Sequence, residues 1–312
     1  MKYSLKISLA IVIIVILVAS FGIISFSDNN KAITLKASKV EPKILSNNLS
    51  NSSLNWMNNS YFDVMHDHNQ ILDYIEALEK DNLMDKRPKI LINFDSHSDT
   101  YHNNSHIEKG EDNSGNWVNQ LMSKGIIDEY YWVQPILTEK NTVLVKTFWK
   151  ENAALDKYFI NSASKFDIYR NLENNHLIFN TSVKNTGNYS VIKFTKTKSS
   201  DLPDFSSQNK QIILSIDADY FANANEEPLP IELIDETELN SRISEFLETI
   251  KSKGILPTIV ACSVSPLYLS GFQTNLEAFF NILKAHSLNQ NDYLQTYTRS
   301  EEVKWTPSVK AK

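Results

Sequence analysis

Short apolar runs alternate with amphipathic segments through the central part of the chain. Residues 89–94 (KILINF) and 211–216 (QIILSI) are β-branched and apolar at successive positions, as in strands buried on both faces of a parallel sheet. Three more strands are predicted at residues 61–65, 130–134 and 257–262, and helical spacing predicts helices at 69–82, 117–124, 237–253 and 271–286. This alternation predicts an α/β fold of three layers, with a mainly parallel sheet covered by helices on both faces.

The amino-terminal segment has a different character. Residues 7–26 form an apolar run without a charged residue, and Lys2 and Lys6 precede it. A membrane-spanning helix needs roughly 20 such residues, more than the usual apolar region of a cleaved signal. We therefore predict a signal anchor or signal peptide at residues 1–26. The lysines orient its amino end toward the cytoplasm, so we expect a single-pass cell-membrane protein with its body outside the cytoplasm, or a secreted protein if the segment is cleaved.

Two further regions stand apart from the alternating pattern. Residues 27–58 are rich in Asn, Ser and Lys without a sustained period, which predicts a flexible polar linker before a domain at residues 59–312. Residues 138–210 contain strand-like pieces at 142–147, 176–179 and 190–194 and a helical piece at 152–159. We interpret residues 138–210 as an insertion or a set of elaborated connections.

The composition narrows the classes of partner. The net charge is −6 and no basic stretch with interleaved aromatic residues occurs, which argues against nucleic acid as a partner. Cys262 is the single cysteine, which excludes an intrachain disulfide framework. The partners we expect are a small-molecule or cell-surface substrate and, through the amino-terminal helix, the membrane.

The strands at 89–94 and 211–216 both end in acidic residues at alternate positions. Asp95, His97 and Asp99 follow the first strand, and Asp217 and Asp219 follow the second. Because ligands of open α/β sheets bind at the carboxyl ends of the strands, we expect both clusters to reach one crevice. A divalent cation is the simplest partner for such groups, which would otherwise be buried unpaired. The alternative for the first cluster is a polar turn with a hydrogen-bonded histidine.

Four further histidines are candidates for the same chemistry. His66 and His68 lie between the strand at 61–65 and the following helix, and one of them is expected to bind metal. Residues 101–116 form a long stretch with almost no aliphatic residues, and loops of this length in compact domains are usually functional. His102 and His106 within it are candidate catalytic proton shuttles, with an ordinary surface role as the alternative.

These motifs resemble the arginase/deacetylase superfamily, whose ureohydrolase branch binds two manganese ions through a DH, a DxHxD and a DxD. The resemblance implies two divalent ions, with manganese favoured over zinc or iron, and it selects His68 over His66. The implied ligands are His68, Asp95, His97, Asp99, Asp217 and Asp219, with Asp95 and Asp217 shared between the ions. A single-ion, deacetylase-like site would need fewer carboxylates, so the presence of both Asp99 and Asp219 favours two ions.

Within that superfamily the chain is more similar to an uncharacterised, arginase-related family of unknown function. The stretches that carry this resemblance are HDHN at 66–69, DSHSD at 95–99, GNW through GII to YWVQP at 115–135, and DADYF at 217–221. The resemblance extends over about residues 61–285, with a poorly matched middle. It implies an arginase-like fold and hydrolysis of a C–N bond by metal-activated water.

The chain departs from the guanidine hydrolases at one place. Those enzymes carry a glutamate after the strand that follows the DxD, where it pairs with the cationic substrate, whereas this chain has CSVSP at 262–266. The hydroxyls of Ser263 and Ser265 suit a neutral amide or a hydroxylated substrate better than a guanidinium ion. Glu226 and Glu227 are the residues that could fold over the site and supply the missing charge.

Two classes of function are therefore compatible with the pattern. The first is a metal-dependent hydrolase, with two ions, that cleaves an amide-like or amidine-like bond. The alternative is a membrane-anchored metal-binding or scaffold protein with an arginase-like fold and no activity. The full set of ligand-type residues favours the hydrolase.

Overall fold

The computed structural model describes residues 55–57, 60–100, 115–135, 165–178, 187–221, 235–264 and 273–286. Within these ranges, no helix has the length and apolar character needed to cross a membrane. The predicted anchor, residues 1–26, lies outside the described ranges, and so does nearly all of the predicted linker.

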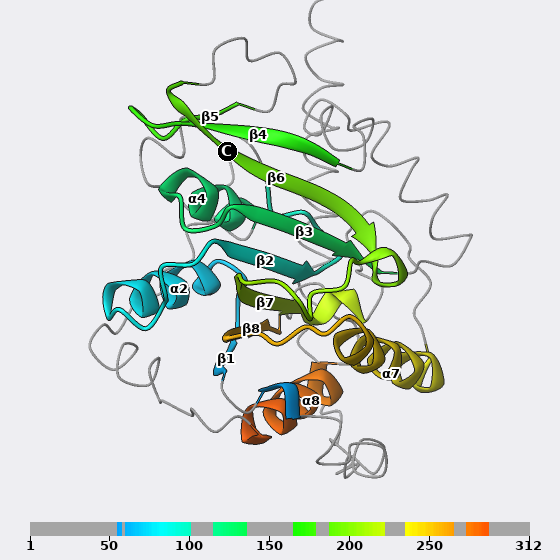
Figure 1. Cartoon of the computed structure of the whole chain (residues 1–312). Helices are drawn as coiled ribbons and strands as arrows, with labels where there is room; N and C mark the ends of the chain where they lie inside the picture. Colours follow the sequence, from blue (N-terminus) through cyan, green and yellow to red (C-terminus); the bar gives the residue numbers. More distant parts are fainter. Residues whose placement is uncertain are drawn as a thin grey trace, which may run out of the picture. The chain divides into compact units, whose positions relative to one another are not determined.

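An eight-stranded sheet lies at the centre of the described part, with the strand order β1-β8-β7-β2-β3-β6-β4-β5 (Figure 1). The strands are β1 (Tyr61–Met65), β2 (Lys89–Phe94), β3 (Glu129–Gln134), β4 (Lys165–Asn171), β5 (Leu177–Ile178), β6 (Tyr189–Lys198), β7 (Gln211–Asp217) and β8 (Ile259–Ser263). The neighbours from β1 to β6 in this order pair in parallel. Strand β4 is the one that runs against the others, because it pairs in antiparallel fashion with both β6 and β5. The predicted mainly parallel sheet is therefore confirmed.

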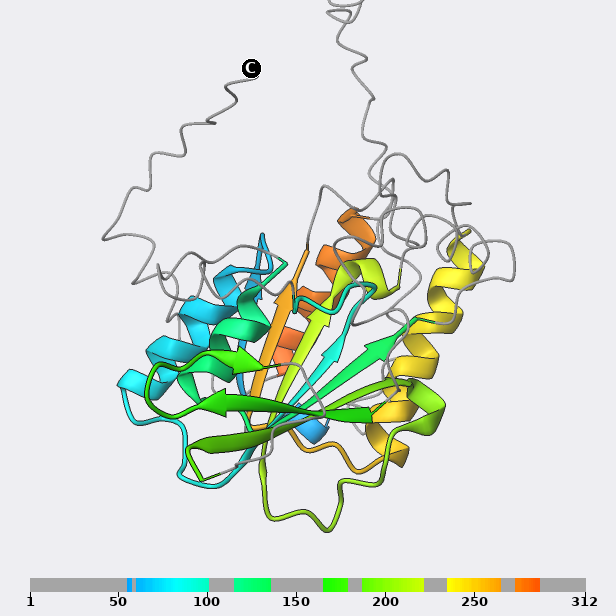
Figure 2. The ribbon, with the colours of Figure 1, turned by 90° about the horizontal axis from the view of Figure 1, so that it is seen from above.

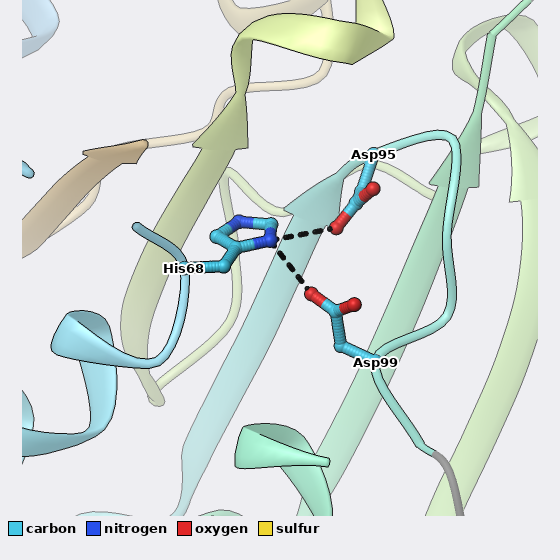
Figure 3. Close-up of side chains that lie close together, drawn as sticks. All are labelled: His68, Asp95 and Asp99. Atoms are coloured by element: carbon cyan, nitrogen blue, oxygen red, sulfur yellow. Dashed lines mark ion pairs between the residues drawn. The ribbon is translucent and has the colours of Figure 1, made fainter. Parts of the chain in front are cut away.

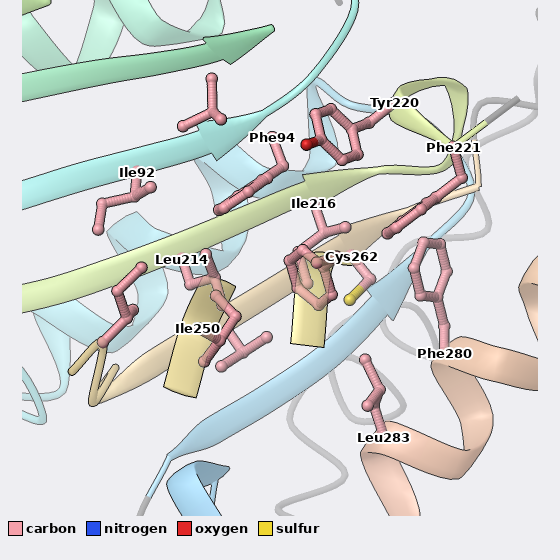
Figure 4. Packing of buried hydrophobic residues seen from close by; sticks show 14 of the residues in the cluster. Ile92, Phe94, Leu214, Ile216, Tyr220, Phe221, Ile250, Cys262, Phe280 and Leu283 are labelled. Carbon is pink, nitrogen blue, oxygen red and sulfur yellow. The ribbon is translucent and has the colours of Figure 1, made fainter. Parts of the chain in front are cut away.

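Helices flank the sheet on both faces (Figure 2). They are α2 (Gln70–Lys80), α4 (Trp117–Lys124), α7 (Glu236–Ser252) and α8 (Gln273–His286). Because side chains alternate along a strand, Leu91 and Ile213 pack toward α2 and α4. Their neighbours Ile92 and Leu214 instead pack toward α7 and α8, as Figure 4 shows. Both faces of the central strands are thus buried, which explains their unbroken apolar runs.

The region at 138–210 extends this sheet. Strand β6 is longer than the predicted piece at 190–194, and β5 coincides with part of the predicted piece at 176–179. Strand β4 was not predicted, because Ile168 is its only fully buried residue and the apolar signal is correspondingly weak. The predicted strand at 142–147 and helix at 152–159 lie outside the described residues.

The chain changes direction across the sheet between β2 and β7. Strand β2 continues through α4 to its neighbour β3 on one side, whereas β7 continues through α7 to its neighbour β8 on the other. Helices α4 and α7 lie on opposite faces of the sheet. In open α/β sheets, such a switch point between neighbouring strands is where ligands bind, at the carboxyl ends. Asp95 directly follows β2 and Asp217 ends β7, so both residues flank this point.

Two glycines that end helices provide a test of these connections. Gly125 and Gly254 both have positive φ, 71° and 59°, which any other residue adopts at a cost of about 1–2 kcal/mol. A Cβ at Gly125 would meet only the mobile guanidinium end of Arg170, but one at Gly254 would lie 2.9 Å from the backbone N and Cα of Ser206. We expect Gly254→Ala to destabilise the fold more than Gly125→Ala in urea unfolding. Equal losses would contradict the close approach of Ser206.

Candidate metal centre

Three loops converge at the carboxyl ends of β1, β2 and β7. The loop before α2 is shaped by Gln70, whose Oε1 accepts hydrogen bonds from the backbone N–H groups of His66 and Asp67 at 3.0 and 3.1 Å. Asn69, the predicted cap, makes no side-chain capping bond, and the first N–H groups of α2 donate instead to the carbonyls of Asp67, His68 and Asn69. The loop leaves His66 exposed and turns His68 into the protein, where it is 3% exposed.

His68 faces three carboxylates, and Figure 3 shows two of them, those of Asp95 and Asp99. Its Nδ1 lies 2.8 Å from Oδ2 of Asp99, 2.9 Å from Oδ2 of Asp217 and 3.3 Å from Oδ2 of Asp95. All four side chains are buried. A neutral imidazole nitrogen can donate one proton at most, so the carboxylates around it exceed what the ring can satisfy.

A second group lies next to the first and shares one residue with it. His97 Nδ1 is 2.9 Å from Oδ2 of Asp219 and 3.6 Å from Oδ1 of Asp95. Asp95 therefore turns one oxygen toward each histidine, and it belongs to both sets of side chains whose ligand atoms are close enough to hold an ion. The His97 side chain is 23% exposed, so this group is reached from the surface whereas the His68 group is enclosed.

Backbone hydrogen bonds tie the two acidic loops together. The N–H of His97 donates to Oδ1 of Asp95 at 2.7 Å, and the N–H of Asp219 donates to Oδ1 of Asp217 at 3.0 Å. Ser96 joins the loops, because its N–H donates to Oδ1 of Asp219 and its hydroxyl donates to the Asp219 carbonyl. Because the ligands are spaced two residues apart, Asp95 and Asp217 each accept a hydrogen bond from the backbone two residues later. Each bond stabilises the turn that carries the next ligand.

Side chains that the sequence reasoning missed surround these ligands. Asn93 Nδ2 donates to Oδ2 of Asp95 at 3.0 Å, and the indole Nε1 of Trp132 donates to the Asp95 carbonyl at 2.9 Å. The indole Nε1 of Trp117 donates to Oδ2 of Asp99 at 2.6 Å. A polar Asn93 inside an otherwise apolar strand, two positions before Asp95, was the available signal, because such positions share one face of the sheet.

Without a metal, burial favours the protonated form of two of the carboxylates, those of Asp95 and Asp219. Burial, followed by the charge of Asp99, raises the pKa of Asp95 from 3.8 to about 7, although His68 opposes the shift. Burial and the charges of Asp217 and Asp95 likewise raise the pKa of Asp219 to about 7. Burial lowers the pKa of His68, but the charges of the facing aspartates outweigh it and raise this pKa well above 6.5.

The residues fit divalent metal ions. Imidazole nitrogen and carboxylate oxygen are ligands that manganese, zinc and iron share. A cation within each group would replace the protons that the buried carboxylates otherwise hold. The structure therefore contains groups that could hold a metal ion, His68 with Asp95 and Asp99, and Asp95 with His97 and Asp219.

Six of the predicted site residues lie together, and others fall outside the described residues. The six ligand candidates His68, Asp95, His97, Asp99, Asp217 and Asp219 are connected through the contacts above. Asp217 was expected to be shared like Asp95. In the structure its Oδ2 faces His68, while its Oδ1 accepts from the Asp219 backbone. His102, His106, Glu226, Glu227 and Ser265 lie outside the described residues.

No model of a known protein family matches the chain, and a search of curated proteins gave no match either. The argument for function therefore rests on the geometry of the two groups.

The raised pKa values predict how the stability of the metal-free protein depends on pH. Asp95 and Asp219 titrate near 7 when folded and near 3.8 when unfolded, so the folded state holds protons that the unfolded chain releases in between. Stability should therefore fall as the pH rises from about 4 to above 7. The raised pKa of His68 acts in the same direction at higher pH, because its contribution is lost as the pH rises through the folded value.

Thermal unfolding at about pH 5.5 and about pH 8, with chelator or with Mn²⁺, measures this dependence. Because metal competes with protons, Mn²⁺ should raise the unfolding midpoint more at the higher pH. Asp219→Asn, which removes one of the titrating groups, should flatten the slope of the metal-free protein. A larger effect of Mn²⁺ at the acidic pH would contradict the assignment.

The shared position of Asp95 predicts a difference between two isosteric variants. Asp95→Asn alters both groups and should abolish binding of both ions, whereas Asp99→Asn alters only the His68 group and should leave one ion bound. Elemental analysis of freshly purified, undialysed protein gives the metal content. Two ions retained by Asp95→Asn would show that Asp95 is not shared.

Proposed function

We propose that this chain is a metal-dependent hydrolase with two ions that cleaves a C–N bond, of the amide or amidine type, in a small or cell-surface substrate. The observation that carries the proposal is the pair of buried His/Asp groups that share Asp95 at the switch point of the sheet. Two divalent ions bound there would activate a water molecule for attack and polarise the bond beside it. Manganese is the favoured metal.

The two groups of ligands would have different roles, because they differ in exposure to solvent. His97 is the partly exposed member, so a substrate would approach from the side of His97 and Asp219. The enclosed His68 group, by contrast, keeps solvent away from Asp99 and Asp217. Water exclusion of this kind strengthens electrostatic interactions inside the site.

The single cysteine does not offer another nucleophile. Cys262 is fully buried and packs in the cluster on the α7 and α8 face. Its burial, together with the charges of Asp63 and Asp217, raises the pKa of the thiol well above 9.0 and keeps it protonated. Since a thiolate is the reactive form, this residue does not support covalent catalysis.

The neighbourhood of Asp217 supports a neutral substrate. Ser263 ends β8, pairs with Asp217 across the parallel ladder and is fully buried. In the guanidine hydrolases that the sequence resembles, a glutamate near this place pairs with the substrate cation. A hydroxyl cannot compensate a desolvated guanidinium, so we propose an arginase/deacetylase-like hydrolase whose substrate is not a guanidine.

Turnover with Mn²⁺-loaded protein tests the proposed function. We expect hydrolysis of some members of a panel of N-acetylated amines and primary amides, and loss of that activity in Asp95→Asn. Arginine and agmatine should release urea at less than about one turnover per second, the low end of ordinary enzyme rates.

The neutral substrate and the hydrolase activity can each be contradicted by a separate result. Urea release above that rate would refute the assignment of a neutral substrate. Stoichiometric metal without turnover on any amide would favour the non-catalytic metal-binding alternative.

A further inference from the structure

We infer that Trp117 is a positioning residue of the metal centre, which holds the ligand Asp99 through its indole N–H and the ligand His68 through its ring. This inference rests on the metal binding of the proposed function and not on the identity of the substrate. It adds to the centre a residue from α4, an element that supplies no ligand itself.

The hydrogen bond between Trp117 and Asp99 is short and enclosed. Nε1 of Trp117 lies 2.6 Å from Oδ2 of Asp99, and the two residues are 0% and 5% exposed. Bonds from a neutral donor to a carboxylate are shorter and stronger than bonds between neutral groups. An indole N–H has no acceptor function and cannot bind a cation, so it orients the carboxylate without competing for the metal.

Asp99 needs such a partner because its backbone is strained. Its φ is 49°, in the left-handed region that residues other than glycine seldom adopt. Conformations of this kind persist at functional sites when the surroundings determine them. Trp117 is the first residue of α4, so its hydrogen bond anchors the loop residue Asp99 to that helix.

The same side chain also fixes His68. The two ring centroids lie 5.4 Å apart with a tilt of 48°. A metal-binding histidine usually donates its second N–H to a carbonyl or carboxylate, which sets the ring orientation. Nε2 of His68 is buried and has no hydrogen-bond partner among the described residues, so the ring orientation depends on the contacts of Nδ1 and on packing. Trp117 provides that packing from one side.

The consequence is a selective dependence of the metal centre on Trp117. The two ligands that Trp117 holds, Asp99 and His68, both belong to the enclosed group of His68, Asp95 and Asp99. Loss of the indole should therefore weaken binding of the ion in the His68 group more than binding of the other ion. A general loss of folding would weaken both.

The variant Trp117→Phe tests this selectivity, because it keeps an aromatic ring and removes the N–H. Metal affinities of the full-length chain are measured by competition between Mn²⁺-loaded protein and a chelator. We expect the more tightly enclosed ion to bind roughly 10- to 100-fold more weakly, the usual effect of removing an outer hydrogen-bond partner of a ligand. The affinity of the second ion should change little.

Trp56→Phe is the matched control. Trp56 is also buried, in the cluster on the opposite face of the sheet, and its indole nitrogen has no hydrogen-bond partner among the described residues. This variant should bind both ions like the wild-type protein. Unchanged affinities in Trp117→Phe, or equal losses for both ions in a folded variant, would overturn the inference.

A measurement on the wild-type chain covers the case in which Trp117→Phe does not fold. The chain has five tryptophans, so the ¹⁵N-labelled indole of Trp117 can be assigned by elimination from Phe variants of the other four. Loading with diamagnetic Zn²⁺ should shift the Trp117 indole signal and leave that of Trp56 in place. An unmoved Trp117 signal in protein that has bound metal would overturn the inference, whereas wild-type protein that binds no metal would refute the proposed function itself.

Discussion

The mutual repulsion of buried carboxylates is the constraint on which the rest of this structure depends. Asp95, Asp99, Asp217 and Asp219 are each 5% exposed or less, and they meet at the ends of two adjacent strands. Such groups are stable only when a proton, a histidine or a cation balances them. The raised pKa values of Asp95 and Asp219 favour a proton in that role, and divalent ions are the natural replacement. The presence of this cluster in a folded chain is therefore best explained by the binding of cations.

The sheet supplies the framework that makes the cluster possible. Parallel strands with both faces covered by helices keep β2 and β7 rigid and adjacent, so the residues that follow them cannot move apart. The reversal of chain direction between these strands leaves their carboxyl ends unobstructed by a direct connection. Hydrogen bonds from Ser96 and from the backbone of His97 then hold the acidic loops at a spacing that suits cations.

The enclosed group and the exposed group also differ in what surrounds them. Indole and amide N–H groups from Trp117, Trp132 and Asn93 surround Asp95 and Asp99, while His97 opens toward solvent. An ion in the enclosed group would experience a drier, more rigid environment, where charge interactions are stronger. An ion in the exposed group would be the one that a substrate can approach. In the proposed hydrolase, the ion in the enclosed group would support the site and the ion in the exposed group would meet the substrate.

The sequence by itself determined the central strands, the four helices and the candidate ligands, because these depend on local patterns. Apolar runs that end in alternating acidic residues identify both a buried strand and the chemistry at its end. The resemblance favoured His68 over His66, but only the tertiary structure gave the physical reason, which is that the loop held by Gln70 turns His68 toward the carboxylates. The tertiary structure also decided the sharing of Asp95 and the contacts of Trp117, because residues distant in sequence become neighbours only when the strands and helices pack. Strand β4 belongs to the same class, since pairing with β6 rather than its own apolar pattern stabilises it.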